Sequence, residues 1–285
     1  MKLADIFRYD GKHVLVVGGA TGMGAAVAEL AKELGGVVTV MDYAPIPMEC
    51  AAKIQIDIAH KNSIDSALAQ IAEPINAVFC CAGVANCTPG IEKINFVGHR
   101  YLLECLVEKG NLSRGSSVCF IASSAGLGWE TNFAELSEVL DIADFEAAAE
   151  WFRKTGRANY SGTKQAVCAY VAREAFAFLQ KGIRINAICP GPTDTPLAQA
   201  NKDQWLGMGS DFRAAAGVEP STAMEQALPM AFLCSDAAAA ITGTTMVADL
   251  GWFNAGRLHT FPGATPIAEH IMGSKIPKPR SADAE

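Results

Sequence analysis

The sequence has no apolar run long enough to cross a membrane, and its first residues, MKLADIFRYDGKH, carry charges where a signal peptide has an apolar core. It also lacks an excess of positive charge. The 30 Asp and Glu against 23 Lys and Arg give a formal net charge of -7. Nucleic acids and anionic membranes attract basic surfaces, so neither is expected as a partner. These absences predict a cytoplasmic protein.

Cysteine pairs with metal-binding spacing are missing as well. The nine cysteines are odd in number, and the local cluster of Cys80, Cys81 and Cys87 has no C-x-x-C pair and no nearby histidine. A zinc site needs such pairs, whereas reduced cysteines serve as small core residues. We therefore expect core cysteines and no metal.

The chain does contain an alternation of short apolar runs and helical stretches. The apolar runs lie at 13–17, 37–41, 53–56, 76–81, 117–122, 184–189 and 244–248, and helical spacing occurs at 25–34, 63–72 and 96–108. Continuous apolar strands between helices are typical of a parallel sheet covered on both faces. The sequence therefore predicts an α/β, Rossmann-like, doubly wound fold with a seven-stranded parallel sheet.

Two segments interrupt this alternation. Residues 129–158 contain a helical pattern with Asp144 as a plausible N-cap and Gly156 as its end, which predicts a helical insertion, and residues 196–222 form a long substrate loop. We expect a single domain over residues 1–260. The remaining residues, 261–285, have four prolines and no apolar periodicity, which predicts an extended or partly disordered tail.

A glycine-rich segment, GGATGMG, follows the first strand and precedes an alanine-rich helix. Gly18, Gly22 and Gly24 permit a tight turn that brings the backbone close to a pyrophosphate at the helix N-terminus, and Thr21 and Met23 complete the loop. The strand, loop and helix context favours a dinucleotide site over a turn without a ligand.

Asp42 ends the second strand, where a carboxylate can accept both ribose hydroxyls and repel the 2′-phosphate of NADP. Tyr43 follows, and no lysine or arginine stands beside Asp42 or at Thr21. NAD is therefore favoured over NADP, with a solvated turn residue as the other interpretation of Asp42. Asp57 and then Ile58 follow the third strand, and Asp57 is a weaker candidate for the adenine edge.

The segment YSGTK opens a long helical stretch. Tyr160 and Lys164 are four residues apart and so share a helix face. The ammonium and a nearby positive nicotinamide ring would lower the pKa of Tyr160 from about 10, which makes Tyr160 a candidate acid or base. Y-x-x-x-K by itself occurs often by chance, and a surface tyrosine with a solvated lysine would then be the better interpretation.

Together these motifs resemble the short-chain dehydrogenases/reductases over residues 10–255. The series runs through the glycine loop, CCAG at 80–83, Asn95, the serine after the fifth strand, Tyr160 with Lys164, CPGPTDT at 189–195 and ITGTTMVADLG at 241–251. Val17, Cys80, Cys81 and Leu250 depart from the family's usual threonine, asparagines and glycine, at positions that support loop and strand packing.

The resemblance implies a role for each matching residue. Tyr160 would donate or accept the proton, Lys164 would lower its pKa and bind the nicotinamide ribose, and Asn95 would hold a water of the proton relay. The further cofactor contacts implied are Cys81, Ala82 and Gly83 along the adenosine ribose, and Ile188, Pro190, Gly191, Thr193 and Thr195 around the nicotinamide.

Two serines follow the fifth strand in IASSAG. The family usually has a serine, two residues and then a glycine, and Gly126 fits that register for Ser123. Ser123 is therefore the catalytic candidate, donating a hydrogen bond to the substrate oxygen as charge develops, and Ser124 is assigned to the turn. The reverse assignment stays open.

Ser123 and Tyr160 are 37 positions apart, more than is usual in the family. The extra segment resembles an insertion in the bacterial 3α-hydroxysteroid dehydrogenase/carbonyl reductase subgroup, where it alters the subunit interface. We expect a homodimer or homotetramer. An apolar substrate pocket is predicted from Trp129, Phe133, Trp151, Phe152, Pro192, Trp205, Met208 and Phe212, although ordinary packing or a subunit contact explains each one as well.

Such a pocket suits a bulky hydroxysteroid-like, alicyclic or aromatic substrate, terpenoid and lignin-type aryl alcohols included. The expected activity is NAD-dependent interconversion of a secondary alcohol and a ketone by hydride transfer, with Tyr160 as acid or base. A dinucleotide-binding regulator or sensor without catalysis is the alternative. Because Ser123, Asn95, Tyr160 and Lys164 are all present, the enzyme is favoured.

Overall fold

The structure is a computed structural model that describes residues 3–272, and seven parallel strands form its central sheet. These strands are β1 (His13–Val17), β2 (Val37–Asp42), β3 (Ala52–Gln55), β4 (Ile75–Cys80), β5 (Leu112–Ile121), β6 (Arg184–Pro190) and β9 (Thr245–Ala248). Their order across the sheet is β3-β2-β1-β4-β5-β6-β9, and every neighbouring pair is parallel. The predicted seven-stranded doubly wound sheet is confirmed.

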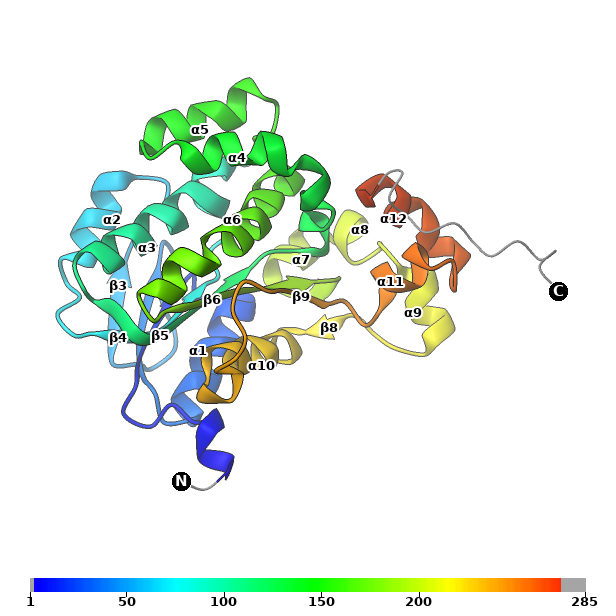
Figure 1. The fold of residues 1–285 in the computed structure, drawn as a ribbon. Coiled ribbons are helices and arrows are strands. Elements are labelled where there is room, and N and C mark those ends of the chain that lie inside the picture. The colour runs from blue at the N-terminus through cyan, green and yellow to red at the C-terminus, as the bar shows by residue number, and fades with distance from the viewer. Residues whose placement is uncertain (1–2, 273–285) are drawn as a thin grey trace.

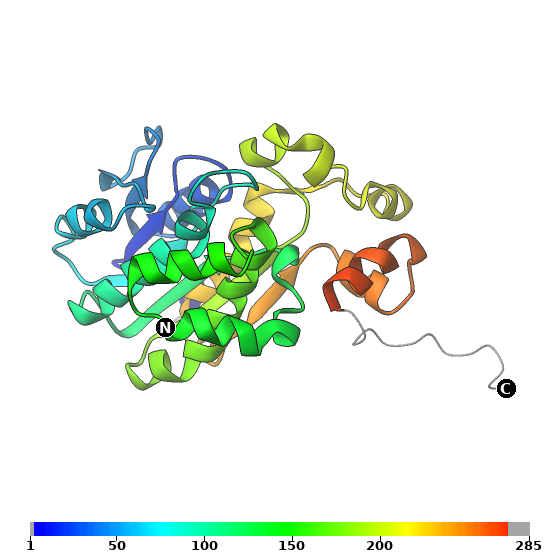
Figure 2. The same ribbon diagram turned by 90° about the horizontal axis from the view of Figure 1, so that it is seen from above.

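Helices cover both faces of this sheet (Figures 1 and 2). One face carries α1 (Gly22–Glu33) and α10 (Ala223–Cys234), and the other carries α2 (Lys61–Leu68), α3 (Gly98–Glu108) and α6 (Tyr160–Gln180). The strands alternate between the two layers: Val14 and Val16 pack under α1, whereas Leu15 and Val17 face the opposite layer. Because both faces are buried, the strands are apolar at nearly every position.

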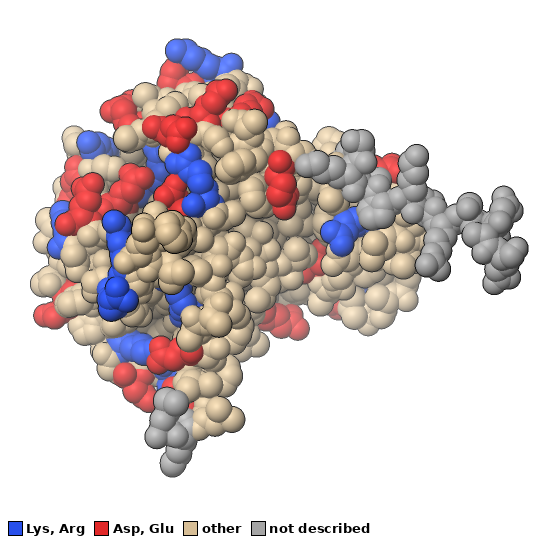
Figure 3. Space-filling view, viewed as in Figure 1, with Lys and Arg blue, Asp and Glu red and all other residues tan. Residues whose placement is uncertain are grey.

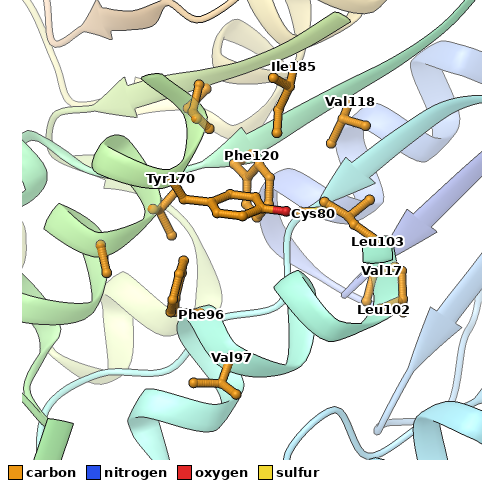
Figure 4. Close-up of a cluster of buried hydrophobic side chains, with 14 of the residues drawn as sticks. Val17, Cys80, Phe96, Val97, Leu102, Leu103, Val118, Phe120, Tyr170 and Ile185 are labelled. Atoms are coloured by element: carbon orange, nitrogen blue, oxygen red, sulfur yellow. The ribbon is translucent and has the colours of Figure 1, made fainter. Parts of the chain in front are cut away.

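Aliphatic and aromatic side chains together fill the layer under α3 and α6 (Figure 4). The Tyr170 ring of α6 lies edge-on to Phe96 at 5.8 Å and to Phe120 of β5 at 6.1 Å between centroids. All three side chains are buried. This packing fixes α6, and with it the Tyr160 end of the helix, against the sheet.

Some boundaries differ from those predicted. Strand β5 begins at Leu112, five residues before the expected apolar run, because its exposed first residues are polar and give no apolar signal. The helix expected at 96–108 is α3 preceded by a π-helical turn, Lys93–Val97, that contains Asn95. Such turns insert one extra residue into a helix and occur frequently at functional sites. A short two-stranded pair, β7 (Thr193–Asp194) with β8 (Ser221–Thr222), was not predicted.

The segment between β5 and α6 is helical, as predicted. It holds 3₁₀ turns at Ser124–Gly126 and Trp129–Asn132, then α4 (Phe133–Asp141) and α5 (Phe145–Lys154). Asp144 caps α5, its Oδ1 accepting from the Ala147 N–H at 2.8 Å. Helices α4 and α5 pack on α6 and on the π-helical turn, and the buried Arg100 of α3 donates to the carbonyl oxygens of Val139 and Ile142.

The loop predicted at 196–222 contains three short helices, α7 (Pro196–Ala200), α8 (Lys202–Trp205) and α9 (Ser210–Ala216). With α11 (Trp252–Arg257) and α12 (Thr265–Met272), α8 and α9 lie at one end of the molecule in both views (Figures 1 and 2). This end extends beyond the carboxyl ends of the strands, where ligands bind in open α/β sheets.

The prediction of an extended tail is wrong for residues 261–272. A 3₁₀ turn at Pro262–Ala264 leads into α12, which packs on α11. Ala264 and Ala268 are fully buried and four residues apart, so this helix has a buried face, and Pro266 falls in its first turn, where proline is tolerated. The rest of the predicted tail lies outside the described residues.

Leu250, noted above as a departure from the family's glycine, adopts φ +60° and is half exposed. A side chain in this left-handed region destabilises the folded state by about 1–2 kcal/mol relative to glycine. Part of this difference is offset because glycine loses more conformational entropy when the chain folds. The Leu250→Gly variant is therefore expected to raise the free energy of unfolding by about 0.5–1 kcal/mol in urea titrations. Leu258, similarly exposed but at φ -99°, is the matched control, and Leu258→Gly is expected to lose stability. A loss at both positions would contradict the strain argument.

The described surface has two further properties. No helix within residues 3–272 combines the length and apolarity needed to cross a membrane, and no group of three or more His, Cys, Asp or Glu in that range is arranged to hold a metal ion. Acidic and basic side chains are interspersed on the face shown in Figure 3. The described part of this face therefore presents no continuous basic stripe of the kind that follows a nucleic-acid backbone.

Candidate active site

A cavity of about 520 Å³ lies at the carboxyl ends of β1 to β4. Most of the residues predicted to bind the cofactor line it: Gly18, Thr21, Gly22, Met23, Gly24, Asp42, Tyr43, Asp57, Ile58, Cys81, Ala82, Gly83 and Thr195. We call this cavity the dinucleotide groove. The groove is formed by the segments that follow β1, β2, β3 and β4, because the carboxyl ends of parallel strands lie along the same edge of the sheet.

The glycine loop forms the floor of the groove. A Cβ on Gly18 would collide with the backbone of Ala82, and one on Gly24 would collide with the Gly18 carbonyl oxygen. The N–H groups of Cys81 and Ala82 both donate to the Val17 carbonyl oxygen at 2.8 Å, so backbone bonds hold the loop where the family's usual polar side chains are absent. The exposed loop backbone and the N-terminus of α1 fit the phosphates of a dinucleotide.

Asp42 is held in a fixed orientation at the wall of the groove. Its two carboxylate oxygens accept from the N–H groups of Ala20 and Ala44, each at 2.8 Å. Tyr43 is mostly exposed at the rim. Asp57 accepts from the Ala59 N–H at 3.0 Å and lies on the same wall. The carboxylate of Asp42 therefore presents its remaining lone pairs toward the groove in a rigid setting.

The sequence interpretation also missed residues of this groove, and it assigned others that do not line it. His60, Val84, Thr88, Pro89 and Leu197 were missed, although each lies just after a strand or in the loop after β6. Of the nicotinamide set, Pro190, Gly191 and Thr193 do not line the groove. They form the turn before Thr195: the Thr193 hydroxyl donates to the Gly191 carbonyl at 3.0 Å, and Gly191 packs against Asp249.

Tyr160, Lys164 and Ser123 meet where β5 ends and α6 begins. A hydrogen bond joins the side chains of Tyr160 and Ser123. The Lys164 Nζ lies 5.6 Å from the centroid of the Tyr160 ring and donates to the Ile121 carbonyl oxygen at 2.7 Å. Ser123 is also the cap of the following turn, since its Oγ accepts from the Ala125 N–H at 3.1 Å. Ser124 is the first residue of that turn, and Ser123 both caps the turn and contacts Tyr160.

Burial shifts the pKa of both titratable groups. Desolvation lowers the pKa of Lys164, which is 3% exposed, to about 8. Desolvation raises the pKa of Tyr160 above its usual value, and the hydrogen bond with Ser123 lowers it in part. We expected Lys164 to lower the pKa of Tyr160. In the protein without a cofactor the pKa is instead raised, because desolvation of the phenol is the larger influence.

Asn95 connects the loop after β4 to α6. Its Oδ1 accepts from the Val84 N–H at 2.8 Å, and its Nδ2 donates to the Val84 carbonyl and the Thr163 hydroxyl at 3.1 and 3.2 Å. Both N–H groups of the amide are therefore used within the chain. The side chain of Asn95 therefore positions the loop and α6, and its role in holding a relay water stays a prediction.

A second asparagine of the same loop, Asn86, was not predicted. Its Oδ1 accepts from the backbone N–H of Tyr160 at 2.7 Å, and Asn159 caps the helix through the N–H of Gly162 at 2.9 Å. The first turn of α6 is thereby fixed from two sides. Asn86 lies 74 residues from Tyr160, so no local sequence signal marks this contact.

The aromatic residues predicted for the substrate pocket separate into two groups. Trp205 of α8 contacts the Tyr160 ring, with 4.9 Å between centroids, and Pro192 and Phe212 line a small space beside Trp252. Trp151, in contrast, is in the core, where its Nε1 donates to Glu138 at 2.9 Å. Phe152 packs in the core and Trp129 packs against it. Phe133 is exposed and lies edge-on to Trp129, and Met208 lines a second cavity.

The prediction that α4 and α5 border the substrate pocket is wrong for Trp151 and Phe152, because the apolar face of α5 packs inward. The start of the insertion, around Thr131 and Asn132, does border a cavity. The oligomeric state stays a prediction.

The sheet order and the dinucleotide groove define a Rossmann-like dinucleotide-binding protein. Comparisons with known proteins narrow this class. A family model described as Enoyl-(Acyl carrier protein) reductase matches residues 141–253. The coniferyl-alcohol dehydrogenase of Pseudomonas sp. (strain HR199 / DSM 7063) is 26% identical over 84% of this chain and 96% of its own.

Two hydroxysteroid dehydrogenases are also similar. The 3-alpha-hydroxysteroid dehydrogenase/carbonyl reductase of Comamonas testosteroni is 29% identical over 84% of this chain and 95% of its own. The crystal structure of the 3-alpha-hydroxysteroid dehydrogenase from Pseudomonas sp. B-0831 complexed with NADH aligns with a TM-score of 0.68 and 25% identity, over 84% of this chain and 95% of that chain. In sequence and fold the chain is therefore similar to the short-chain dehydrogenases/reductases, whose members bind a nicotinamide dinucleotide and small-molecule substrates.

Proposed function

We propose that this protein is an NAD-dependent oxidoreductase that interconverts a secondary alcohol and a ketone on a bulky, largely apolar ring compound. The observation that carries the proposal is the contact between the Tyr160 and Ser123 hydroxyls beside the buried Lys164 ammonium, at the end of the dinucleotide groove. Two hydroxyls and a cation at one point provide what proton transfer to or from a substrate oxygen requires.

The groove residues would hold the cofactor. The loop of Gly18 to Gly24 would bind its phosphates, Asp42 the adenosine ribose, and Thr195 the nicotinamide end. Lys164 would join Thr195 there, because its Nζ lies beside Gly83 of the groove. When bound, NAD accepts a hydride from the carbinol carbon, and NADH returns it to the carbonyl carbon.

Each catalytic candidate has a separate task. Tyr160 exchanges its hydroxyl proton with the substrate oxygen, and Ser123 donates a hydrogen bond to the same oxygen while negative charge develops there. Lys164, charged below pH 8, lies 5.6 Å from the Tyr160 ring, and together with the positive nicotinamide ring it would favour the phenolate form of Tyr160 once the cofactor is bound. Asn95 and Asn86 act as positioning residues, because they bind the backbone and side chains that hold α6 in place.

The substrate class is supported by two observations. Trp205 places an apolar ring face against Tyr160, which suits an alicyclic or aromatic substrate. The relatives named above are a coniferyl-alcohol dehydrogenase and 3-alpha-hydroxysteroid dehydrogenases, and both names refer to ring-containing alcohols.

A substrate panel tests the proposal. Purified protein is mixed with NAD and with steroid, terpenoid, alicyclic or aryl secondary alcohols, and NADH formation is followed by its absorbance. We expect turnover of at least one ring alcohol. Binding of NAD without any turnover across the panel, in both directions, would instead favour the dinucleotide-binding sensor.

Cofactor preference provides a prediction for Asp42. Asn at this position keeps the shape but removes the charge that repels a 2′-phosphate, so Asp42→Asn is expected to raise the ratio of kcat/KM with NADP to that with NAD by at least about tenfold. Initial rates with both cofactors measure this ratio. The control is Glu49→Ala, a highly exposed acid outside the groove. An unchanged ratio in Asp42→Asn would mean that Asp42 only holds the loop through Ala20 and Ala44.

A further inference from the structure

A second cavity, of about 620 Å³, lies beside the catalytic candidates. Its wall includes Ser124 and Ala125, which directly follow Ser123, and Ser161, which directly follows Tyr160. The other lining residues are Thr131, Asn132, Gln165, Met208, Trp252, Ile267, His270, Ile271 and Met272. Helix α12, beyond the part of the chain that resembles the family, closes one side. We call this space the distal cavity.

The wall of the distal cavity combines hydrogen-bonding and apolar side chains. Serine, threonine, asparagine and glutamine line the side formed by the turns after β5 and by α6, and Ile267 and Ile271 of α12 line the other. None of the described lining residues is Asp, Glu, Lys or Arg. The cavity therefore suits a compound that is mostly hydrocarbon and has a few polar atoms on one side.

Gln165 is the residue of this wall whose amide orientation is fixed by its neighbours. Its Oε1 accepts from Asn132 Nδ2 at 3.0 Å and from Arg157 Nη1 at 3.2 Å. Arginine only donates, so this bond fixes the orientation of the Gln165 amide. Arg157 is itself held by the Glu135 carboxylate. The Nε2 group of Gln165 is left with no acceptor among the described residues, and it is available as a hydrogen-bond donor.

Trp252 contributes an indole ring to the same wall. Its side chain is 6% exposed and lines the cavity, but its Nε1 lies against Gly209, outside the cavity wall. Gln165 is therefore the donor whose pairing a ligand can complete. An unpaired donor on a cavity wall points to an oxygen acceptor on the ligand, because a bound acceptor recovers the free energy of the missing hydrogen bond.

The distal cavity and the reaction site share the loop after β6. Met208 lines the cavity, and three residues before it Trp205 contacts the Tyr160 ring. The cavity therefore lies next to the reaction site, beside the residues that directly follow Ser123 and Tyr160.

We propose that the distal cavity binds the end of the substrate remote from the reacting carbon, and that Gln165 donates a hydrogen bond to an oxygen atom there. The inference rests on the proposed function and specifies its substrate class: a ring alcohol with a second oxygen-bearing group, such as a hydroxyl, carbonyl, ether or carboxylate. Gln165 is then a specificity-determining residue, because an analogue without the oxygen leaves its Nε2 unpaired.

Matched substrate pairs test this inference. One pair is 4-methoxycyclohexanol and 4-ethylcyclohexanol, and a second pair carries the same two substituents on the far ring of a fused two-ring alcohol. Within each pair only an acceptor oxygen replaces a methylene. For at least one pair we expect the wild-type kcat/KM to favour the methoxy compound by about tenfold. In Gln165→Met that ratio falls close to one, while the value for the ethyl compound is unchanged.

The controls separate recognition from folding. Gln180→Met changes the same residue type at the exposed end of α6 and should leave the ratio unchanged. Gln165→Glu keeps an acceptor oxygen for Asn132 and Arg157 but removes the donor, and it should lower the ratio if Gln165→Met proves unstable. A wild-type ratio near one for both pairs, or a ratio that Gln165→Met leaves unchanged, overturns the inference.

Calorimetric binding of the same alcohols in the presence of NADH distinguishes the two proposals. Turnover of ring alcohols without a methoxy preference retains the proposed function and rejects the distal site. Preferential binding of the methoxy compound that depends on Gln165, with no turnover of any alcohol, retains the distal site and rejects the proposed function.

Discussion

Tyr160→Phe is expected to lower kcat with the best alcohol of the panel by about 10²–10⁴-fold, the usual contribution of a positioned acid or base. The substitution removes one hydroxyl, which forms the hydrogen bond with Ser123. Tyr160 does not line the dinucleotide groove. The NADH affinity should therefore change by less than about threefold, which corresponds to the loss of one weak hydrogen bond at most. Steady-state kinetics and fluorescence titration with NADH measure the two quantities.

Tyr170→Phe is the matched control for this variant. Tyr170 lies on the same helix, buried among Phe96 and Phe120 and outside the groove. It should keep nearly full turnover. If Tyr160→Phe retained more than about a tenth of wild-type kcat, the loss would be smaller than the usual contribution of an acid or base. Tyr160 would then not be the group that exchanges the proton.

The features that the sequence predicted well are those whose physical cause is local. Strand β1 matches its predicted bounds because both faces of the sheet are buried, so a continuous apolar run marks its whole length. The glycine loop is equally local, since strand, loop and helix follow one another directly. The insertion was found from its own cap, Asp144, and from the apolar face of α5.

Other features depend on contacts between distant segments. The bond from the Tyr160 N–H to Asn86 joins residues that share no local pattern. Trp151 shows a second limit: an apolar residue at helical spacing gives the same signal whether it faces a pocket or the core. The pKa of Tyr160 depends on how deeply the phenol is buried, and a motif alone contains no such information.

Lys164 differs from an ordinary surface lysine in its effect on stability. Its pKa falls from 10.5 to about 8 because the ammonium is buried. Between these two pH values the unfolded chain binds more protons than the folded chain, so the free energy of unfolding rises with pH. Below pH 8 both states are protonated and the folded protein carries the full cost of burying the charge, about 3 kcal/mol at about 1.4 kcal/mol per pKa unit.

Lys164→Met is therefore expected to raise the free energy of unfolding at pH 7 by about 2 kcal/mol, after the loss of the hydrogen bond to Ile121 is allowed for. The same variant should lose most of its alcohol dehydrogenase activity, as is common where an active site retains a destabilising charge. Urea titrations at pH 7 and pH 9.5 measure the effect, and the gain should shrink at the higher pH because wild-type Lys164 then becomes neutral. Lys181→Met, at the exposed end of α6, should show no such pH dependence. A variant less stable than wild type at pH 7 would show that the contacts of the Lys164 ammonium outweigh its desolvation.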